Sequence, residues 1–477
     1  MSGSRSNSIG LVEAAGRRAA LLLPLLFFFA AAAWAQSDSA QPSPDLPATI
    51  VGDLPKIPGG QPSFPSVPTI VPDLPAYQVA QNPNRIDSEQ NATPVQALSN
   101  VLGEVPNRSS IYTSLRYSGG YESSAAESSL NFMGSLNLLL KQKQGETILM
   151  YAGGDEFHTK GGNANSIFHR VSFSQALHTP RWNFGVSEQF DDLPASGSGT
   201  GSYGGVQTPI SDLLLSMGPN LLLQPARRYS NSSMVSVERI FRPHWSLFAH
   251  GGYGFLEFPD TGFVSYRSPW GGAGIRYALR NQDVVSLDAT AILTHFSGAT
   301  AMRSYQLSAK YKHVFLRRYS VELSAGPEIA DYIAYAARQR RATVDGRASV
   351  SRAVGRGYTS VIYKHSTDAG GGIMRGAEAD DLQIAYGRAI ARGWQLTLST
   401  GWNHGSTVST LLAPGLPTSY NSGYGGFNLE RKMNRSFSWF LNYAFRYQTT
   451  DQVLLSTIRS HVAMAGFYWN PRPIAIH

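Results

Sequence analysis

The sequence contains no cysteine among its 477 residues. A disulfide framework, a cysteine-ligated metal site and a thiol nucleophile are therefore excluded. Charged residues are also scarce, at 15% of the chain, and no apolar run beyond the N-terminal segment approaches the ~20 residues of a membrane-spanning helix. Glycine, tyrosine and phenylalanine are instead plentiful, with 47, 23 and 22 of each. This balance is typical of a β-barrel whose apolar face meets lipid in place of a core.

The formal net charge is +8, but the basic residues are dispersed along the chain and do not cluster. A nucleic-acid-binding surface would need a basic patch or stripe. We therefore expect no nucleic-acid partner.

The clearest structural signal is the stretch 436–448, which reads SFSWFLNYAFRYQ. Successive side chains of a strand point to opposite faces, so every second residue shares a face. One set of alternate residues is Phe437, Trp439, Leu441, Tyr443, Phe445 and Tyr447; the other is Ser438, Phe440, Asn442, Ala444, Arg446 and Gln448. An aromatic face opposite a polar one predicts a transmembrane barrel strand with lipid outside and a wet lumen inside.

The same alternation continues from residue 110 to residue 469 and predicts an all-β fold. We expect a transmembrane antiparallel up-and-down barrel of about 18 strands, and any count from 16 to 18 fits the pattern. Short connections alternate with longer ones, as in outer-membrane barrels with short periplasmic turns and long external loops. The expected short turns are 141–146, 178–181, 242–244, 280–283, 317–319, 354–357, 391–393 and 432–435. The expected long loops are 192–227, 296–303, 329–341, 366–380, 405–418 and 449–457.

The N-terminal part predicts export and a non-globular arm. Residues 1–35 have a positive region, an apolar stretch and an Ala33-Trp34-Ala35 cleavage site, as in a signal peptide that would leave Gln36 as the first mature residue. Residues 36–109 form a proline-rich arm, expected to be disordered and periplasmic, with a short helix at 94–102. Residues 36–84 fit either a tether or a docking segment for a periplasmic partner. Residues 470–477 follow the last strand as a tail.

Two residue sets define the candidate site. The expected lumen-lining residues are Arg170, Asp288, Lys310, Lys312, Glu322, Asp345, Arg347, Arg431, Asn442 and Arg446. The expected membrane-interface aromatics are Trp182, Trp245, Tyr319, Trp394, Trp402, Trp439 and Tyr447. The loop 192–227 has the place of the loop that narrows general porins, although an external lid is an equal alternative.

The sequence gives no enzyme or cofactor signal. Gly199, Gly201 and Gly204 match a dinucleotide fingerprint in letters only, because no strand–helix unit surrounds them. The eleven histidines are scattered, and no spacing selects a catalytic set. We expect no catalytic residues, no metal and no cofactor.

The final strand, HVAMAGFYW at 461–469, resembles the C-terminal signal by which the barrel-assembly machinery recognises its clients, although eight further residues follow it. On this architecture, residues 110–469 resemble a bacterial outer-membrane β-barrel of the porin-like superfamily. The resemblance implies a channel for passive diffusion of small polar solutes or ions, embedded in outer-membrane lipid. An export component that docks a partner through its arm, for example in exopolysaccharide secretion, and an outer-membrane hydrolase are the alternatives. The sequence does not settle the oligomeric state.

Overall fold

The computed structural model describes residues 109–476 except for 124–126, 160–165, 194–226, 243, 260–262, 281–282, 299, 316–318, 335–336, 355–356, 372–373, 409–417 and 452–456. The expected signal peptide, the proline-rich arm, the helix at 94–102 and nearly all of the 192–227 loop lie outside the described residues. Within them, no helix is long and apolar enough to cross a membrane.

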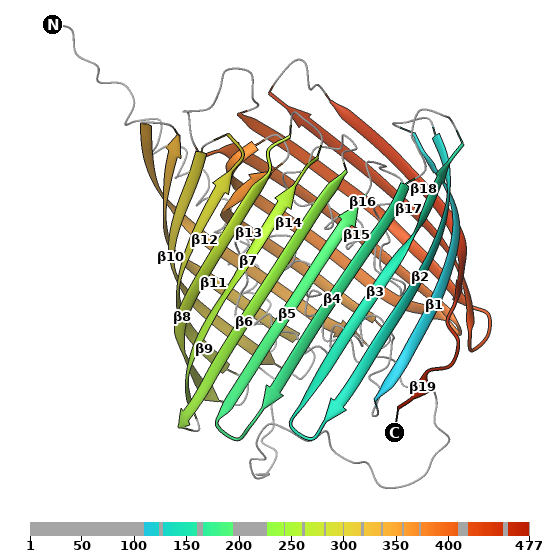
Figure 1. Cartoon of the computed structure of the whole chain (residues 1–477), viewed down its shortest axis with the longest axis horizontal. Helices are drawn as coiled ribbons and strands as arrows, with labels where there is room; N and C mark the ends of the chain where they lie inside the picture. The colour runs from blue at the N-terminus through green and yellow to red at the C-terminus, as the bar shows by residue number, and fades with distance from the viewer. Residues whose placement is uncertain are drawn as a thin grey trace, which may run out of the picture. The chain divides into compact units, whose positions relative to one another are not determined.

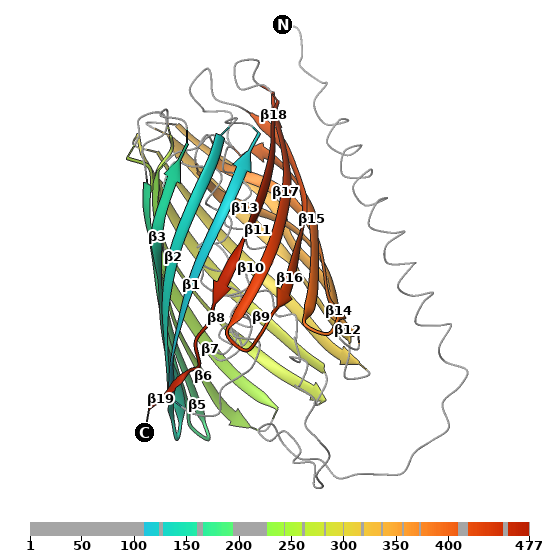
Figure 2. The same ribbon diagram turned by 90° about the vertical axis from the view of Figure 1, so that its right-hand side faces the viewer.

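The described residues form nineteen strands (Figures 1 and 2). Their bounds are β1 Ser110–Glu122, β2 Glu127–Gln142, β3 Gly145–His158, β4 Ser166–His178, β5 Trp182–Leu193, β6 Arg228–Arg242, β7 Trp245–Glu257, β8 Tyr266–Arg280, β9 Asp283–Phe296, β10 Thr300–Phe315, β11 Tyr319–Ala334, β12 Ala337–Val354, β13 Gly357–Gly371, β14 Met374–Ala391, β15 Trp394–Thr407, β16 Ser419–Lys432, β17 Phe437–Thr450, β18 Ile458–Trp469 and β19 Ile474–Ala475.

Each of the first seventeen strands pairs antiparallel with the next one in sequence, and β18 pairs with β1. The pairing therefore closes an up-and-down barrel of eighteen strands, which confirms the predicted fold class. Closure removes the free strand edges that an open sheet would leave unpaired.

The seam between the two ends of the chain has an extra element. Strand β18 pairs with β1 as far as Trp469 and Leu115, and β19 pairs with the first residues of β1. Pro471 and Pro473 lie between the two strands and cannot donate to a ladder, because proline has no N–H. The expected tail 470–477 thus carries a short strand that extends the seam.

The two faces of the wall follow the period of two. In β17, Ser438, Phe440, Asn442, Ala444 and Arg446 are buried on the inward face, and the alternate residues form the outward face. Described register shifts occur at 240/242, 278/280 and 389/391, each at a strand end. A bulge exchanges the faces for the residues beyond it, and here only the last residue or two of each strand lie beyond, so the alternation holds through the middle of these strands.

The connections separate the two ends of the barrel. At one end, here called the short-turn end, β2–β3, β14–β15 and the other hairpins that the sequence predicted close in a few residues. Gly393 makes one of these turns with a φ of 76°, a backbone conformation that favours glycine. The opposite end is called the long-loop end.

Three of the expected long loops are wrong in extent. Residues 296–303, 329–341 and 366–380 are largely strand, and the connections shrink to 297–299, 335–336 and 372–373. Their polar residues were read as loop, but they still alternate and pair; Asp331, for example, lies opposite Arg340. The strands here therefore extend further toward the long-loop end than the expected loop bounds predicted.

Candidate functional site: the barrel lumen

The inward face carries polar residues of both signs. The structure places nine of the ten expected lumen residues there: Arg170, Asp288, Lys310, Lys312, Glu322, Asp345, Arg347, Asn442 and Arg446. Six of them are buried, whereas Lys312, Glu322 and Arg347 are half-buried. A wet or polar interior behind an apolar outer surface explains why these side chains share one face.

Arg431 is the exception and corrects the prediction. It follows Leu429 on the outward face of β16, lies opposite Trp394, and places its guanidinium 5.2 Å from the centre of that ring. Its inward neighbour is Glu430, which is buried. An arginine near a strand end can lie outward because its long stem lets the charge reach the headgroup zone.

Charges on neighbouring strands meet across the inner wall. Asp288 of β9 has its Oδ2 atom 3.7 Å from Lys310 Nζ of β10 and 3.8 Å from His250 Nε2 of β7. Arg170 of β4 pairs with Asp191 of β5, and both side chains are buried. In these two groups, buried charges of one sign are thus matched by charges of the other, which limits the cost of desolvation.

A second polar cluster centres on Glu238 of β6, nearer the short-turn end. Its carboxylate accepts hydrogen bonds from Ser246 and Arg276, each at 2.6 Å, and from Asn183 at 3.1 Å. These four residues come from four consecutive strands, β5 to β8. The cluster therefore fixes the register of this part of the wall from inside.

The inner surface near the seam is partly aromatic. Arg116 of β1 is buried, with its guanidinium 4.5 Å from the ring centre of Phe440 and 5.5 Å from that of Tyr468. Phe440 and Tyr468 themselves pack at 4.6 Å. Stacking on aromatic faces accommodates a guanidinium here.

The hairpin of β13 and β14 departs from the wall. The pairing of β12 with β13 ends at Gly346 and His365, whereas β13 continues to pair with β14 up to Gly371 and Met374. From His365 onward the hairpin is therefore free of its neighbour β12. We call residues 366–371 and 374–379 the inner hairpin.

The contacts of the inner hairpin lie on other strands. The Thr367 N–H donates to Glu328 Oε2 of β11 at 3.4 Å, and Glu328 is buried on the inward face. Met374 and Ala377 are buried against Tyr420, and Phe263 of the β7–β8 connection packs on the same cluster. β13 also contacts β8, five strands away around the barrel. The inner hairpin thus leans into the lumen and narrows it.

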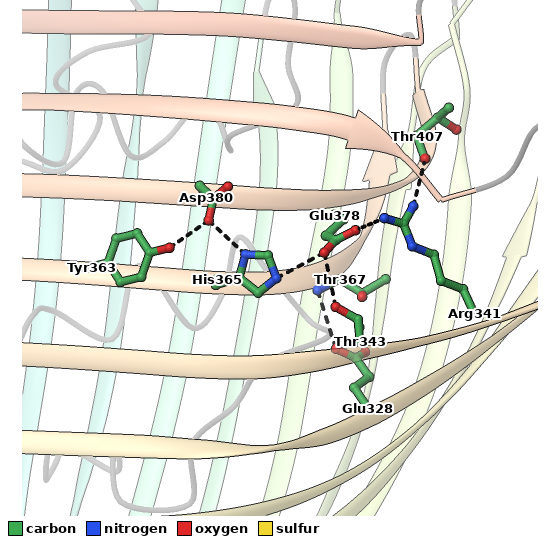
Figure 3. A network of polar contacts seen from close by, with 9 residues as sticks. All are labelled: Glu328, Arg341, Thr343, Tyr363, His365, Thr367, Glu378, Asp380 and Thr407. Carbon is green, nitrogen blue, oxygen red and sulfur yellow. Dashed lines mark hydrogen bonds and ion pairs between the residues drawn. The ribbon is translucent and has the colours of Figure 1, made fainter. Parts of the chain in front are cut away.

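A polar network holds the base of the inner hairpin (Figure 3). Glu378 pairs with Arg341 of β12, accepts a hydrogen bond from Thr343 at 3.1 Å, and lies 3.1 Å from His365 Nε2. His365 Nδ1 is 2.7 Å from Asp380.

Two further hydrogen bonds extend this network. Asp380 also accepts a 2.7 Å hydrogen bond from Tyr363. Arg341 further donates to the Thr407 carbonyl of β15 at 3.5 Å. Arg341 therefore links β12, β14 and β15 at the point where β13 leaves β12.

The sequence analysis missed this constriction. For the loop 192–227 it left open a narrowing of the lumen and an external lid. Only the ends of that loop are described, and Arg227 there makes a bidentate pair with Asp192, at 3.2 and 2.9 Å. The segment 366–380 is rich in glycine and acidic residues and reads as an ordinary external loop. The burial of its Met374 and Ala377 becomes visible only in the structure.

The expected interface aromatics all lie on the outward face, among exposed aliphatic side chains. Near the short-turn end, three of them lie opposite an arginine of the next strand: Trp182 with Arg239, Tyr319 with Arg352, and Trp394 with Arg431. The guanidinium-to-ring distances are 5.2, 4.9 and 5.2 Å. This pattern matches an aromatic girdle with cations just beyond it.

The histidines do not assemble into one site. On the outward face, Tyr151 and Tyr443 lie within hydrogen-bond distance of His169 and His461, at 3.1 and 2.8 Å. Among the described residues, no three histidine or acidic side chains are placed to hold a metal ion.

Comparison with known proteins gives distant likenesses only. No protein-family model matches the chain, and no curated protein matches it. Among solved structures, the outer membrane protein opdK of Pseudomonas aeruginosa is similar at 12% identity and a TM-score of 0.40, over 76% of this chain and 99% of that one. OccK2 (OpdF) of the same species, in complex with glucuronate, is similar at 11% identity and a TM-score of 0.42, over 76% of this chain and 98% of that one. OprD, also from that species, is similar at 10% identity and a TM-score of 0.39, over 76% of this chain and 96% of that one. These values are too low to carry any property of those proteins to this chain, whose function rests on its own residues.

Proposed function

We propose that this protein is an outer-membrane channel through which small polar solutes or ions diffuse passively. The observation that carries the proposal is the closed eighteen-strand wall, apolar outside and lined inside by charges of both signs. An apolar band with an aromatic girdle suits lipid, and pairing around the barrel satisfies the backbone groups of the paired strands without water.

The orientation follows from the topology. The first residue of β1 and the last residue of β18 lie at the short-turn end, because the strand number is even. We place that end in the periplasm and the long-loop end outside, as in outer-membrane barrels generally.

The lumen chemistry supports a channel for polar solutes. Lys310 and Asp288 lie on one part of the wall, and Arg170 and Asp191 lie on another. Matched charges order water and favour polar molecules, whereas a ring of one sign would select strongly for counter-ions. Among the described residues, the inner hairpin extends into the lumen, so we expect it to limit solute size.

Two measurements test the proposal. Gel mobility of unboiled and boiled samples first establishes that the purified protein is a folded barrel. The same sample is then placed in a planar lipid bilayer with a salt gradient. We expect discrete conductance steps and a reversal potential of only modest ion preference. A folded, heat-modifiable barrel that gives no steps at either polarity would contradict the channel.

A further inference from the structure

Outward-facing arginines gather at the long-loop end of β8 to β12, which lie next to one another on one side of the barrel (Figure 1). We call Arg267, Arg303, Arg338, Arg340 and the neighbouring His295 the arginine patch. We propose that this patch binds the phosphate groups of a phosphorylated glycolipid in the outer leaflet. The proposal rests on the proposed function, because it needs the barrel to lie in an outer membrane.

The strand registers bring the patch together. Arg267 lies opposite His295, and Arg303 and Arg340 lie opposite Asp331 from its two sides. Directly opposed residues have Cβ atoms about 5 Å apart, so these side chains form one surface. Each belongs to the same face as lipid-facing aliphatic residues of its own strand, such as Leu307 and Leu323.

Asp331 holds two of the guanidiniums in place. Its carboxylate pairs with Arg338 at 2.6 Å and with Arg340 at 2.7 Å. These side chains are nevertheless 55% and 64% exposed, whereas that of Asp331 is 3% exposed, because the arginines cover it. The two guanidiniums therefore present their remaining donors outward, already oriented for an anion.

The patch keeps an excess of positive charge. Asp331 offsets one cation, and Glu257 pairs with Arg267 at 2.6 Å. Arg303 is exposed, and no hydrogen bond or ion pair joins its guanidinium to another of the described residues. Four arginines therefore face two carboxylates.

The height of the patch fits a lipid headgroup. Arg303 lies twelve residues from Phe315, where β10 ends at the short-turn end, and Asp331 lies twelve residues from Tyr319. At about 3.3 Å per residue and a tilt near 40°, that is roughly 30 Å above the short turns. The apolar band of such barrels is about 25 Å tall, so the patch lies just above it.

Apolar side chains continue directly below the patch. Tyr305, Ile329 and Val344 are 51%, 43% and 60% exposed on the same outward face. A ligand that contacts both surfaces needs a phosphate above and acyl chains below. This arrangement favours a lipid over free phosphate.

The patch is confined to one side of the barrel. Eleven or twelve residues from the short turns, β1 to β4 carry Tyr121, Leu130, Phe157 and Ile167 on the outward face, and all four are exposed. At this height the outward face of β1 to β4 is thus apolar, in contrast to that of β8 to β12. A symmetric dimer through the patch would place like charges against each other, so a second copy is a poor occupant.

The test compares two sets of outward arginines. The patch variant combines Arg303→Gln, Arg338→Gln and Arg340→Gln with Asp331→Asn, so that no buried carboxylate loses its partners. The control variant carries Arg239→Gln, Arg352→Gln and Arg431→Gln, which face outward at the opposite end. Binding of bisphosphorylated lipid A to each detergent-purified barrel is measured by native mass spectrometry, with dephosphorylated lipid A as the second probe.

We expect the patch variant to bind the bisphosphorylated lipid about thirtyfold more weakly, because three cations and one anion are removed and the net loss is two positive charges near a charged surface. The control variant should bind as the unmodified protein does, and the dephosphorylated lipid should bind weakly to all three. Equal binding by the patch and control variants would overturn the proposal, as would equal affinity for the dephosphorylated lipid. Release of the lipid by millimolar inorganic phosphate alone would assign the patch to free phosphate instead.

Arg303→Gln serves as a second variant, because its guanidinium has no ion-pair partner among the described residues to leave behind. It should weaken lipid binding several-fold even if the combined variant does not fold; unchanged binding would count against the patch. Bilayer conductance is recorded on the same preparations. If the unmodified protein conducts but does not bind the bisphosphorylated lipid, only this inference is refuted. If it binds the lipid but does not conduct, only the proposed channel function is refuted.

Discussion

The two faces of β17 make the sharpest test of the barrel, because adjacent residues should respond in opposite ways. Leu441 is outward-facing and 37% exposed, next to Leu429 and Ala465 on the neighbouring strands. Asn442 is buried on the inward face, next to Asn428 and Met464. We consider an arginine at each position in turn.

The depth of Leu441 sets the magnitude. It lies four residues above Phe437, which is about 13 Å along the strand and about 10 Å in height at a tilt near 40°. That places it close to the middle of a band about 25 Å tall. An arginine at the midplane on the lipid face costs roughly 2–4 kcal/mol. Leu441→Arg should therefore lower the folded-to-unfolded ratio by about 30- to 700-fold.

The assay is reversible urea unfolding in lipid vesicles, followed by tryptophan fluorescence. Leu441→Arg should unfold at a clearly lower urea concentration than the unmodified protein, whereas Asn442→Arg should change stability little and alter conductance. If Asn442→Arg were the destabilised variant, the assigned faces would be inverted. If both variants unfolded like the unmodified protein, lipid would not contact this wall and the barrel would not be a membrane protein.

Three further predictions concern the inner hairpin, the seam and a loop base. Arg341→Ala removes the ion pair with Glu378 and the contact with Thr407, so the inner hairpin should loosen and single-channel conductance should rise. Arg352→Ala, on the outward face of the same strand, should leave conductance unchanged. If Arg341→Ala gave no rise, the hairpin would not limit the passage. Deletion of residues 474–477 removes β19 and the hydrogen bond from the Ile476 N–H to the Ser109 carbonyl. This deletion should lower the free energy of unfolding by about 1–3 kcal/mol in the urea assay. Arg472→Ala is the neutral control. For Asp451, just beyond β17, desolvation raises the pKa, but hydrogen bonds from the Thr418 hydroxyl and from backbone N–H groups outweigh it and hold the pKa below its usual range. Because its folded-state pKa is lowered, the stabilisation by Asp451 is present above the ordinary value of ~3.9 and is lost as the pH falls. Asp451→Asn should thus be less stable than the unmodified protein at pH 7. The difference should start to shrink below about pH 4 and disappear only when the pH falls below the lowered folded-state pKa; a difference that stays constant with falling pH would refute this assignment.

The period of two accounts for what could be predicted from the sequence. Alternation in stretches such as 436–448 decides which residues share a face, and the turn residues decide where a strand reverses. Both signals are local, so the all-β class, the number of strands and the positions of Asn442, Trp394 and Trp439 followed from them. The failure at Arg431 was an error of parity, since Leu429 already marks its face as outward.

Long-range pairing accounts for what could not be predicted. Local alternation does not say which cation meets which anion, because Lys310 meets Asp288 only through the register of β9 with β10. Nor does it show that β13 leaves β12 after His365, since that depends on whether Glu328, Arg341 and Tyr420 offer the hairpin better contacts than the wall does.

The arginine patch shows the same division. Its residues are spread from 267 to 340 in the sequence, and each reads as a strand end or a loop. Only the register of five neighbouring strands makes them one surface. The sequence alone thus determined a two-faced wall of about eighteen strands. The tertiary structure decided where that wall narrows and where its outer surface is charged, because both depend on contacts between strands that the period of two does not encode.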